Sequence, residues 1–421
     1  MSKLENWGNR SNMAGIQVSP EIKEGRNQLA VTVVLGHAIK HIYNSGLSTI
    51  LLPEIKLGLG LTGTQLGTLA FSRQLAGWFT TVAAGYLGDR FANKAALMLG
   101  ISMTLRGLSY FFAGFATNYW VMLAAMLFVG IGPSMYHPPA IGALSRRFPD
   151  KRGFAISLHG TGGSVGEVVG PLLTAGALTF LMWQDVLKVS LFPAILAGFL
   201  IWSMMRTVRG EVASTDSTSD YFKSIASLLR KSRLAILVAV TALRSMGQAA
   251  IMIFLPVYLR EDLAYSAFTV AIYLSMAQVV GMFAQPAMGY FSDRLGRKIV
   301  LIPSMTVMGL LFFVLTYADP GWPLIVTIIA LGTFLYSLHT IFIAAAMDVA
   351  GDEVQSTVVS LIYGASFIGT LSPVIAGRIA DNYGTENTFL YGGAMILLAT
   401  LILALTRLPK TANQMAEERV G

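Results

Sequence analysis

The chain has 421 residues, of which 54% are hydrophobic and only 12% are charged, and it contains no cysteine. About a quarter of the residues in a soluble domain are charged, so a chain this long with so few charges cannot cover a water-facing surface. The composition therefore predicts a protein whose main solvent is lipid, and the lack of cysteine excludes disulfides, cysteine-ligated zinc and iron–sulfur clusters. The formal net charge of +8 would suit nucleic acid or anionic lipid, and the positions of the basic residues favour a membrane.

Apolar runs of about 20 residues, each long enough for a helix to cross a bilayer, recur along the chain. Twelve spans are expected, at 27–52, 62–87, 95–115, 118–145, 153–181, 186–206, 233–258, 267–291, 299–318, 323–347, 355–380 and 387–407. They predict two six-helix bundles, 27–206 and 233–407, joined by a polar cytoplasmic linker at 207–232. Residues 1–26 lack the features of a cleaved signal, so we expect cytoplasmic tails at 1–26 and 408–421.

Lysine and arginine are unevenly distributed between the expected loops, and this bias favours one orientation. If the N-terminus is inside, the inside segments hold most of the basic residues. The outside segments hold only Lys56, Lys188, Arg260 and Arg378. The bias predicts a multi-pass protein of a bacterial inner membrane with both termini cytoplasmic. One inside loop departs from it, because residues 348–354 are acidic.

A ten-residue motif occurs once in each half, as GYLGDRFANK from Gly85 and as GYFSDRLGRK from Gly289. A second match, Ser157-Leu158 with Ser360-Leu361, has nearly the same spacing, as expected for a parallel internal repeat. The candidate gating residues of this motif are Gly85, Asp89, Arg90, Gly289, Asp293, Arg294, Gly296, Arg297 and Lys298. Its glycines allow close helix contact and its aspartate can pair with an arginine, so the loop is expected to act as a latch that breaks when the halves rock. The alternative is a basic loop that only sets topology.

Through this motif the chain resembles the major facilitator superfamily, whose members carry such a loop between helices 2 and 3 and often again between helices 8 and 9. The resemblance covers nearly the whole chain, because the number of spans, the charge bias and the repeat all agree with it. It implies an all-α membrane protein with twelve transmembrane helices in two pseudo-symmetric six-helix bundles. Ala92 and Asn93 depart from the motif in the first half.

A second motif, G-x-x-x-G-P, lies in the fifth span at Gly166, Gly170 and Pro171. It resembles the glycine–proline signature of exporting antiporters in the same superfamily, although Ala175-Gly176 stands where that signature has paired glycines. Small residues four apart also permit close helix packing, so plain packing is the alternative interpretation.

Several ionisable side chains lie inside expected spans, where a charge costs about 2.5–3.5 kcal/mol on insertion scales and needs a reason. The candidate substrate and coupling residues are His37, Lys40, His41, His137, Glu167, Arg244 and His339. Arg73 and Arg106 also lie at mid-depth, and all five histidines lie within spans. The superfamily fold implies that helices 1, 4, 7 and 10 line a central cavity, and each of them carries a cationic or potentially cationic group here.

Three interpretations of this set compete. Histidines can carry protons near neutral pH, although His159 and His339 could equally be hydrogen-bonded structure. His37 and His41, four residues apart on one helix face, could bind a divalent metal with a third histidine, but no carboxylate lies near His37 in the sequence, and we assign no metal ligands. A positive cavity would suit an anionic or phosphonate-like substrate.

Within the superfamily the chain resembles the fosmidomycin-resistance group of drug exporters. The resemblance rests on His41-Ile42-Tyr43-Asn44, Leu51-Leu52-Pro53, Tyr136-His137-Pro138 and the glycine run from Gly160 to Pro171. It implies a secondary transporter that exports a small organic solute, which could be anionic, by alternating access coupled to protons. A proton-coupled anion importer and a divalent metal-ion carrier are the alternatives. No phosphate-binding loop or plausible catalytic triad occurs, so we expect no enzyme activity and no cofactor. The expected partners are substrate, protons and lipid, without nucleic acid, for a monomer.

Overall fold

A computed structural model describes residues 24–148, 151–206, 230, 232–350, 362 and 364–406. The ordered elements of this part of the chain are helices, and eight of its helical segments are long and apolar enough to cross a membrane. The all-α fold class predicted from the sequence is confirmed. The expected tails at 1–26 and 408–421 and the expected linker at 207–232 lie almost wholly outside the described residues.

The first half of the chain forms one helical bundle. Its helices are α2 (Arg26–Gly46) continued by η2 (Leu47–Leu51) and α3 (Leu52–Leu59), α4 (Gly63–Arg90), α5 (Ala95–Ala113), α6 (Tyr119–Ser134) with α7 (His137–Arg147), α8 (Arg152–Leu178), and α9 (Trp183–Val189) with α10 (Leu191–Met205). The first span was expected to end at Leu52, but helix continues through a π turn to Leu59. The rod tolerates Pro53, which lies in the first turn of α3 directly after the π turn.

The second half forms a matching bundle. Its helices are α12 (Ser232–Val257) continued by η4 (Tyr258–Asp262), α13 (Ala267–Leu295), α14 (Arg297–Tyr317), α15 (Trp322–Leu335) with α16 (Leu338–Ala350), η6 (Gly369–Leu371) with α18 (Ser372–Tyr383), and α19 (Asn387–Leu405). The fourth helical rod of each half is broken at the same place. One break lies before His137 and the other lies just before His339. The first has an evident cause, since Pro138 and Pro139 favour the start of a new helix.

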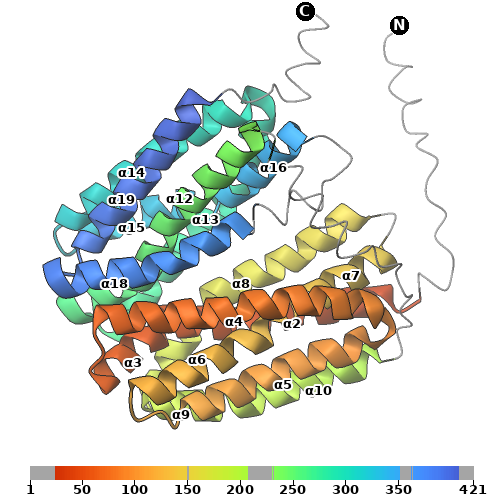
Figure 1. The fold of residues 1–421 in the computed structure, drawn as a ribbon. Coiled ribbons are helices and arrows are strands. Elements are labelled where there is room, and N and C mark those ends of the chain that lie inside the picture. Colours follow the sequence, from red (N-terminus) through yellow and green to blue (C-terminus); the bar gives the residue numbers. More distant parts are fainter. Residues whose placement is uncertain are drawn as a thin grey trace, which may run out of the picture.

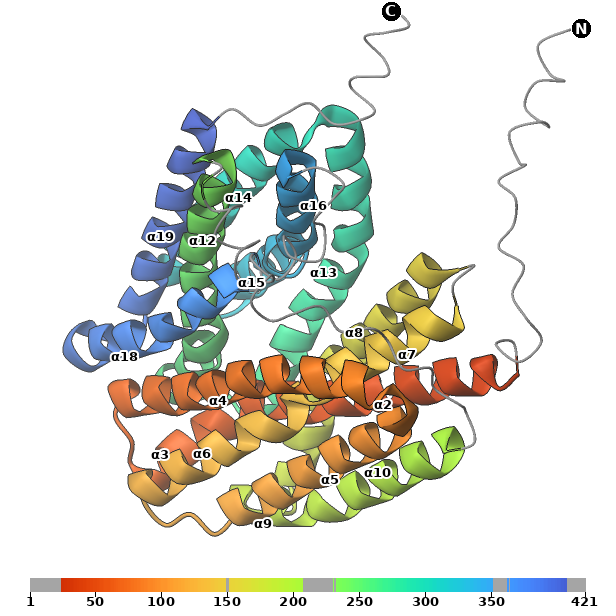
Figure 2. The same ribbon diagram turned by 45° about the vertical axis from the view of Figure 1, so that its right-hand side comes forward.

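The two bundles contact each other along two seams, α4 against α18 and α8 against α13. Figure 1 shows the bundles close together at the end of the molecule that carries α3 and α18, and diverging toward the end that carries α7, α8 and α16. Figure 2 shows the same arrangement from another side. We call the first the α3 end and the second the motif end, because α13 meets α14 there at the Gly289–Lys298 motif.

An apolar core joins the halves toward the α3 end. Leu51, Leu52 and Ile55 of the first helical rod belong to one buried cluster with Phe254 and Val257 of α12. Burial of such side chains is worth roughly 1.5–3 kcal/mol each. The contact at the α3 end is therefore a packed interface and not only a meeting of charged groups.

Gly296 makes the turn between α13 and α14 possible. Its φ of 107° and ψ of 145° lie in a region that is essentially limited to glycine, and one residue suffices to join the two helices. Ala92 holds the corresponding place in the first half and cannot adopt this conformation cheaply. There the chain forms a short 3-10 turn, η3 (Ala92–Lys94), between α4 and α5.

The glycine–proline motif of α8 lies against α2. A Cβ atom on Gly166 would collide with the Ala38 carbonyl oxygen and the His41 side chain, and one on Gly170 would collide with Ile42 and Ser45. These glycines let α8 lie directly on α2, which brings side chains of the two helices to one place.

Candidate functional site

A polar cluster lies inside the first half, where α2, α7 and α8 meet. We call it the N-half cluster, and its members are His37, Lys40, His41, His137, His159 and Glu167. The α2 residues occupy successive turns of one helix face, and the break before α7 places His137 opposite them. The sequence assigned all of these residues except His159 to the candidate site, and the structure brings them together.

Glu167 supplies the carboxylate that the sequence could not place beside the histidines. Its Oε1 atom lies 2.5 Å from Nδ1 of His41, across the close contact of α8 with α2. The Glu167 side chain is 24% exposed and the His41 side chain is 19% exposed, although both residues lie in the middle of their helices. The pair is therefore only partly buried and is reachable from outside the packed core.

His37 is fixed by its neighbours. Its Nδ1 donates to the His159 carbonyl oxygen at 2.6 Å, and its ring stacks on that of His159 with centroids 3.8 Å apart. A carbonyl oxygen only accepts, so Nδ1 carries the proton and Nε2 keeps a lone pair. That Nε2 atom is buried without a protein partner among the described residues. The ring centroids of His41 and His137 are 4.5 and 4.8 Å from that of His37.

Two cations accompany the histidines. Lys40 Nζ contacts Nε2 of His137, and Arg106 of α5 donates from Nη1 to the Lys40 carbonyl oxygen at 2.9 Å. Lys40 is 7% exposed and Arg106 is fully buried. An ammonium group only donates, so His137 accepts through Nε2. Sequence reasoning had noted Arg106 at mid-depth without selecting it, although a lone arginine in an apolar span was a sufficient signal.

Arg73 of α4 adds a third buried cation on the side of α2 nearer the α3 end. It donates to Asn44 Oδ1 at 2.7 Å and to Ser48 Oγ at 3.2 Å. Neither acceptor carries a charge. The first half thus holds Lys40, Arg73 and Arg106 around one carboxylate, Glu167, which leaves an excess of positive charge in this part of the bundle.

The second half places its candidate residues elsewhere. Arg244 of α12 is 1% exposed and lies over Phe342 of α16, with Cζ 5.5 Å from the ring centroid. Its Nε and Nη1 atoms have no hydrogen-bond partner within the described chain. His339 also lies on α16, in the first turn of that helix. Neither residue belongs to the N-half cluster, so the sequence-predicted set is divided between the halves.

Charged side chains at the α3 end connect the halves, and sequence reasoning missed their role. Glu54 accepts from Nε of Arg260 and, at 3.5 Å, from Nη2, while Lys56 pairs with Glu261. We call these two pairs the clasp. Each half contributes one acid and one base, from α3 and from η4. Lys56 and Arg260 had stood out only as exceptions to the positive-inside bias.

Asp381 at the end of α18 caps the first turn of α4 in the other half. Its carboxylate accepts from the N–H groups of Gly63 at 2.5 Å and Thr64 at 2.9 Å, and from the Thr64 hydroxyl at 2.6 Å. The helix dipole favours a negative charge at this position. The α4–α18 seam is therefore held by both charge and hydrogen bonds.

At the motif end Arg297 contacts residues of its own half. It donates to Asp348 Oδ2 at 2.8 Å and to Ser292 Oγ at 2.7 Å, and it pairs with Asp293. Asp348 belongs to the acidic segment 348–354, which departed from the positive-inside bias. Its contact with Arg297 gives a structural reason for an acidic residue at this position. Lys298 donates to the Ala404 carbonyl oxygen at 2.6 Å.

The remaining motif residues bear less directly on the site. Arg294 lies over the Tyr290 ring and Arg90 over the Phe91 ring, with Cζ 4.7 and 5.9 Å from the centroids. Gly85 and Asp89 lie in α4, and the Asp89 side chain lies outside the described part of the chain. The gating role of the motif stays a prediction in both halves.

Similar proteins span most of the chain. The fosmidomycin resistance protein of Escherichia coli (strain K12) is 24% identical over 383 residues, which cover 87% of this chain and 91% of that protein. An uncharacterized MFS-type transporter of Bacillus subtilis (strain 168), YfnC, is 24% identical over 382 residues, covering 87% and 90%. The multidrug resistance protein MdtG of Escherichia coli O17:K52:H18 is 25% identical over 361 residues, covering 80% and 84%.

Solved structures agree with the fold. The nucleoside transporter NupG superposes with a TM-score of 0.76 at 14% identity, over 91% of this chain and 99% of that one. A bacterial homologue of the human lysosomal transporter Spinster, inward-facing and occupied, gives 0.73 at 15% identity, over 90% and 96%. The sequence model of the Major Facilitator Superfamily matches residues 33–369 and again residues 237–419. The chain therefore belongs to the Major Facilitator Superfamily of membrane transporters.

Proposed function

We propose that the protein exports a small organic anion across the bacterial inner membrane by alternating access, coupled to protons. The motif end faces the cytoplasm with both termini, and the α3 end faces outward, as the distribution of lysine and arginine predicts. The relatives named for fosmidomycin and multidrug resistance support export.

The observation that carries the proposal is the hydrogen bond between His41 and Glu167. The neighbouring residue, Val168, accepts through its carbonyl oxygen from Ser275 of α13 at 2.9 Å. The same turn of α8 therefore contacts His41 in its own half, through Glu167, and Ser275 in the opposite half, through Val168. Protonation of Glu167 removes its charge from the contact with α2, and this change acts directly on the helix that forms the α8–α13 seam.

Charge balance supports an anionic substrate. Lys40, Arg73 and Arg106 outnumber Glu167 in the first half, and Arg244 is buried in the second. Buried cations need counter-charges, and arginine binds carboxylate or phosphonate groups with paired donors. A substrate anion that bridges the halves would supply this charge, with Arg244 as its anchor on the second half.

Transport in proteoliposomes under an imposed pH gradient, against a panel of organic anions, tests the proposal. We expect Glu167→Gln to abolish proton-driven flux and to keep substrate exchange, since glutamine keeps the shape and loses the proton site. His41→Gln is the comparison, because it removes the partner and leaves the carboxylate. If both variants keep full pH-dependent flux, this pair does not carry the proton. Movement of the substrate in the same direction as the protons, instead of in the opposite direction, would identify an importer.

A divalent metal-ion carrier is the second candidate. One nitrogen from each of His37, His41 and His137 lies within 4.8 Å of the others, and imidazole suits zinc or nickel. Lys40 argues against it, because its ammonium group contacts His137 and would repel a cation. We therefore keep these histidines unassigned as ligands. Uptake of radioactive nickel or zinc into the same vesicles would decide for the carrier.

A further inference from the structure

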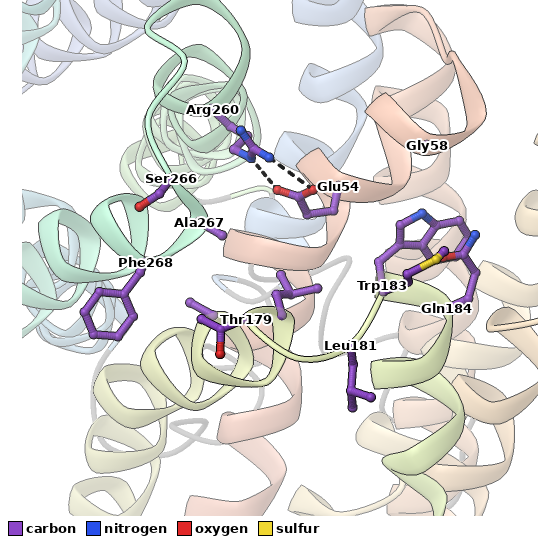
Figure 3. Close-up of a pocket in the computed structure, with 13 residues that line it drawn as sticks. Glu54, Gly58, Thr179, Leu181, Trp183, Gln184, Arg260, Ser266, Ala267 and Phe268 are labelled. Carbon is purple, nitrogen blue, oxygen red and sulfur yellow. Dashed lines mark hydrogen bonds and ion pairs between the residues drawn. The ribbon is translucent and has the colours of Figure 1, made fainter.

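A cavity of about 670 Å³ lies at the α3 end, between the end of α8 with the start of α9 and the start of α13. Figure 3 shows Thr179, Leu181, Trp183 and Gln184 on one side and Ser266, Ala267 and Phe268 on the other, with the Glu54–Arg260 pair in the wall. The cavity thus occupies the boundary of the two halves beside the clasp.

The other seam is closed at the corresponding place. The internal repeat relates α4 to α13, as second helices, and α18 to α8, as fifth helices. On the α4–α18 side, Asp381 occupies the gap and caps α4. On the α8–α13 side, the end of α8 offers Leu178 and Thr179, neither of which is acidic, and the cavity remains. An anion is the group that the second seam lacks by comparison with the first.

Arg260 has donors to spare for such a group. It uses Nε and Nη2 for Glu54 and Nη1 for the Tyr265 carbonyl oxygen at 3.3 Å. A guanidinium group has five N–H donors, so two remain. Spare donors beside a satisfied carboxylate favour an anion over a cation.

Much of the remaining wall is apolar, although Thr179, Gln184 and Ser266 also line it. Leu178, Leu181, Met182, Trp183 and Phe268 line it, and the volume falls in the range of roughly 300–1,000 Å³ that small-molecule sites show. Aromatic walls with a few polar groups suit an amphiphilic ligand, with its charged group at Arg260 and its body on the rings.

We propose that this cavity is an outer binding site for a small organic anion with an apolar body, held by Arg260. The statement that the site faces outward rests on the proposed function, whereas binding itself does not. Because Arg260 also holds Glu54, an anion that draws the guanidinium toward the cavity would weaken the hydrogen bonds to Glu54 and loosen the clasp beside the α8–α13 seam. The α4–α18 seam keeps its own contact through Asp381, so the halves would part first at the cavity.

The absence of cysteine makes a direct test available. Thr179→Cys introduces a single thiol into the cavity wall of the purified full-length chain, and 4-nitrobenzoate serves as the probe anion. We expect millimolar 4-nitrobenzoate to slow labelling by a neutral maleimide several-fold, and uncharged 4-nitrobenzyl alcohol to protect much less. Phe180→Cys is the control, because Phe180 is 89% exposed beside the cavity and should gain no protection.

A matched pair of variants in the Thr179→Cys background identifies the anion contact. Arg260→Gln should weaken protection about tenfold or more, because it removes a charged hydrogen-bond donor. Lys56→Gln breaks the other clasp pair, and Lys56 does not line the cavity, so protection should be unchanged. Monodisperse elution of each variant excludes misfolding.

Three results would overturn the inference. They are no protection of Thr179→Cys by 4-nitrobenzoate, equal protection by the uncharged probe, and equal losses in Arg260→Gln and Lys56→Gln. Binding in detergent is measured without transport. A protein that binds the probe but does not export anions would refute the proposed function and leave this site standing.

Discussion

The two halves share one architecture but divide the charged residues between them very differently. The first half gathers four histidines, three buried cations and a carboxylate, whereas the second buries Arg244 against an aromatic ring. Even the histidines that follow the two helix breaks differ, since His137 contacts a lysine and His339 lies in the half with the buried arginine. The first half therefore combines titratable groups with buried arginines, whereas the second half buries one arginine whose Nε and Nη1 atoms have no hydrogen-bond partner among the described residues.

The largest expected effect comes from a substitution that tests whether Arg244 of the second half binds the substrate. Arg244→Gln should weaken substrate binding at least about 30-fold, because truncating one partner of a buried charged contact costs roughly 2–5 kcal/mol. The concentration dependence of uptake into proteoliposomes measures it. Arg378→Gln, an exposed arginine in the same half, should leave uptake unchanged. Equal affinities in wild type and Arg244→Gln would remove Arg244 from the site.

A charge reversal in the clasp tests whether the halves are held where they meet. Arg260→Glu sets two acids face to face and should shift the population toward separation at the α3 end by several-fold, since such pairs are worth about 0–1 kcal/mol and reverse sign. Spin labels on introduced cysteines at Phe180 and Tyr317, both highly exposed, would report the distance between halves. The double variant Glu54→Arg/Arg260→Glu should restore the short distance. Failure of that rescue would mean that the clasp does not set the distance.

The motif end offers a smaller effect within the second half. Arg297 pairs with Asp293, which is 55% exposed, and with Asp348, which is 27% exposed. The less exposed pair is less screened, so Asp348→Asn should slow transport about two- to threefold and Asp293→Asn somewhat less. Initial rates at saturating substrate measure both. Normal rates in both variants would leave the loop with a topological role alone.

The smallest expected effect on transport concerns the turn that distinguishes the two motifs. Gly296→Ala should lower stability by about 1–3 kcal/mol, because alanine is strained at this φ and ψ. Ala92→Gly in the first half should change little, since the chain there makes a 3-10 turn that does not need glycine. Thermal melting of the purified variants compares them. Equal melting temperatures would show that the α13–α14 joint can rearrange.

The sequence predicted those features that depend on one helix at a time. The spans follow from apolar runs, the motif from an internal repeat, and the shared face of His37 and His41 from helical periodicity. The fold class predicted from these features was confirmed. The pairing of Glu54 with Arg260, which are 206 residues apart, depends on how the two bundles meet, and no local pattern encodes that. The contact between Glu167 and His41 was not predicted for a similar reason. The glycines of α8 indicated close packing with another helix, but they did not identify that helix as α2. The first helix was expected to end at Leu52, whereas the helical rod continues past Pro53 to Leu59.

The clasp has a further consequence for the environment in which the protein works. Its four side chains are 17–30% exposed, so dissolved ions reach them. At physiological ionic strength the screening length is about 8 Å, and in dilute water it is several times longer. In the proposed orientation, the strength of these ion pairs would depend on the salinity of the outside medium, before any ligand or proton binds. Salt would weaken the charged part of this closure and leave its packed apolar part in place.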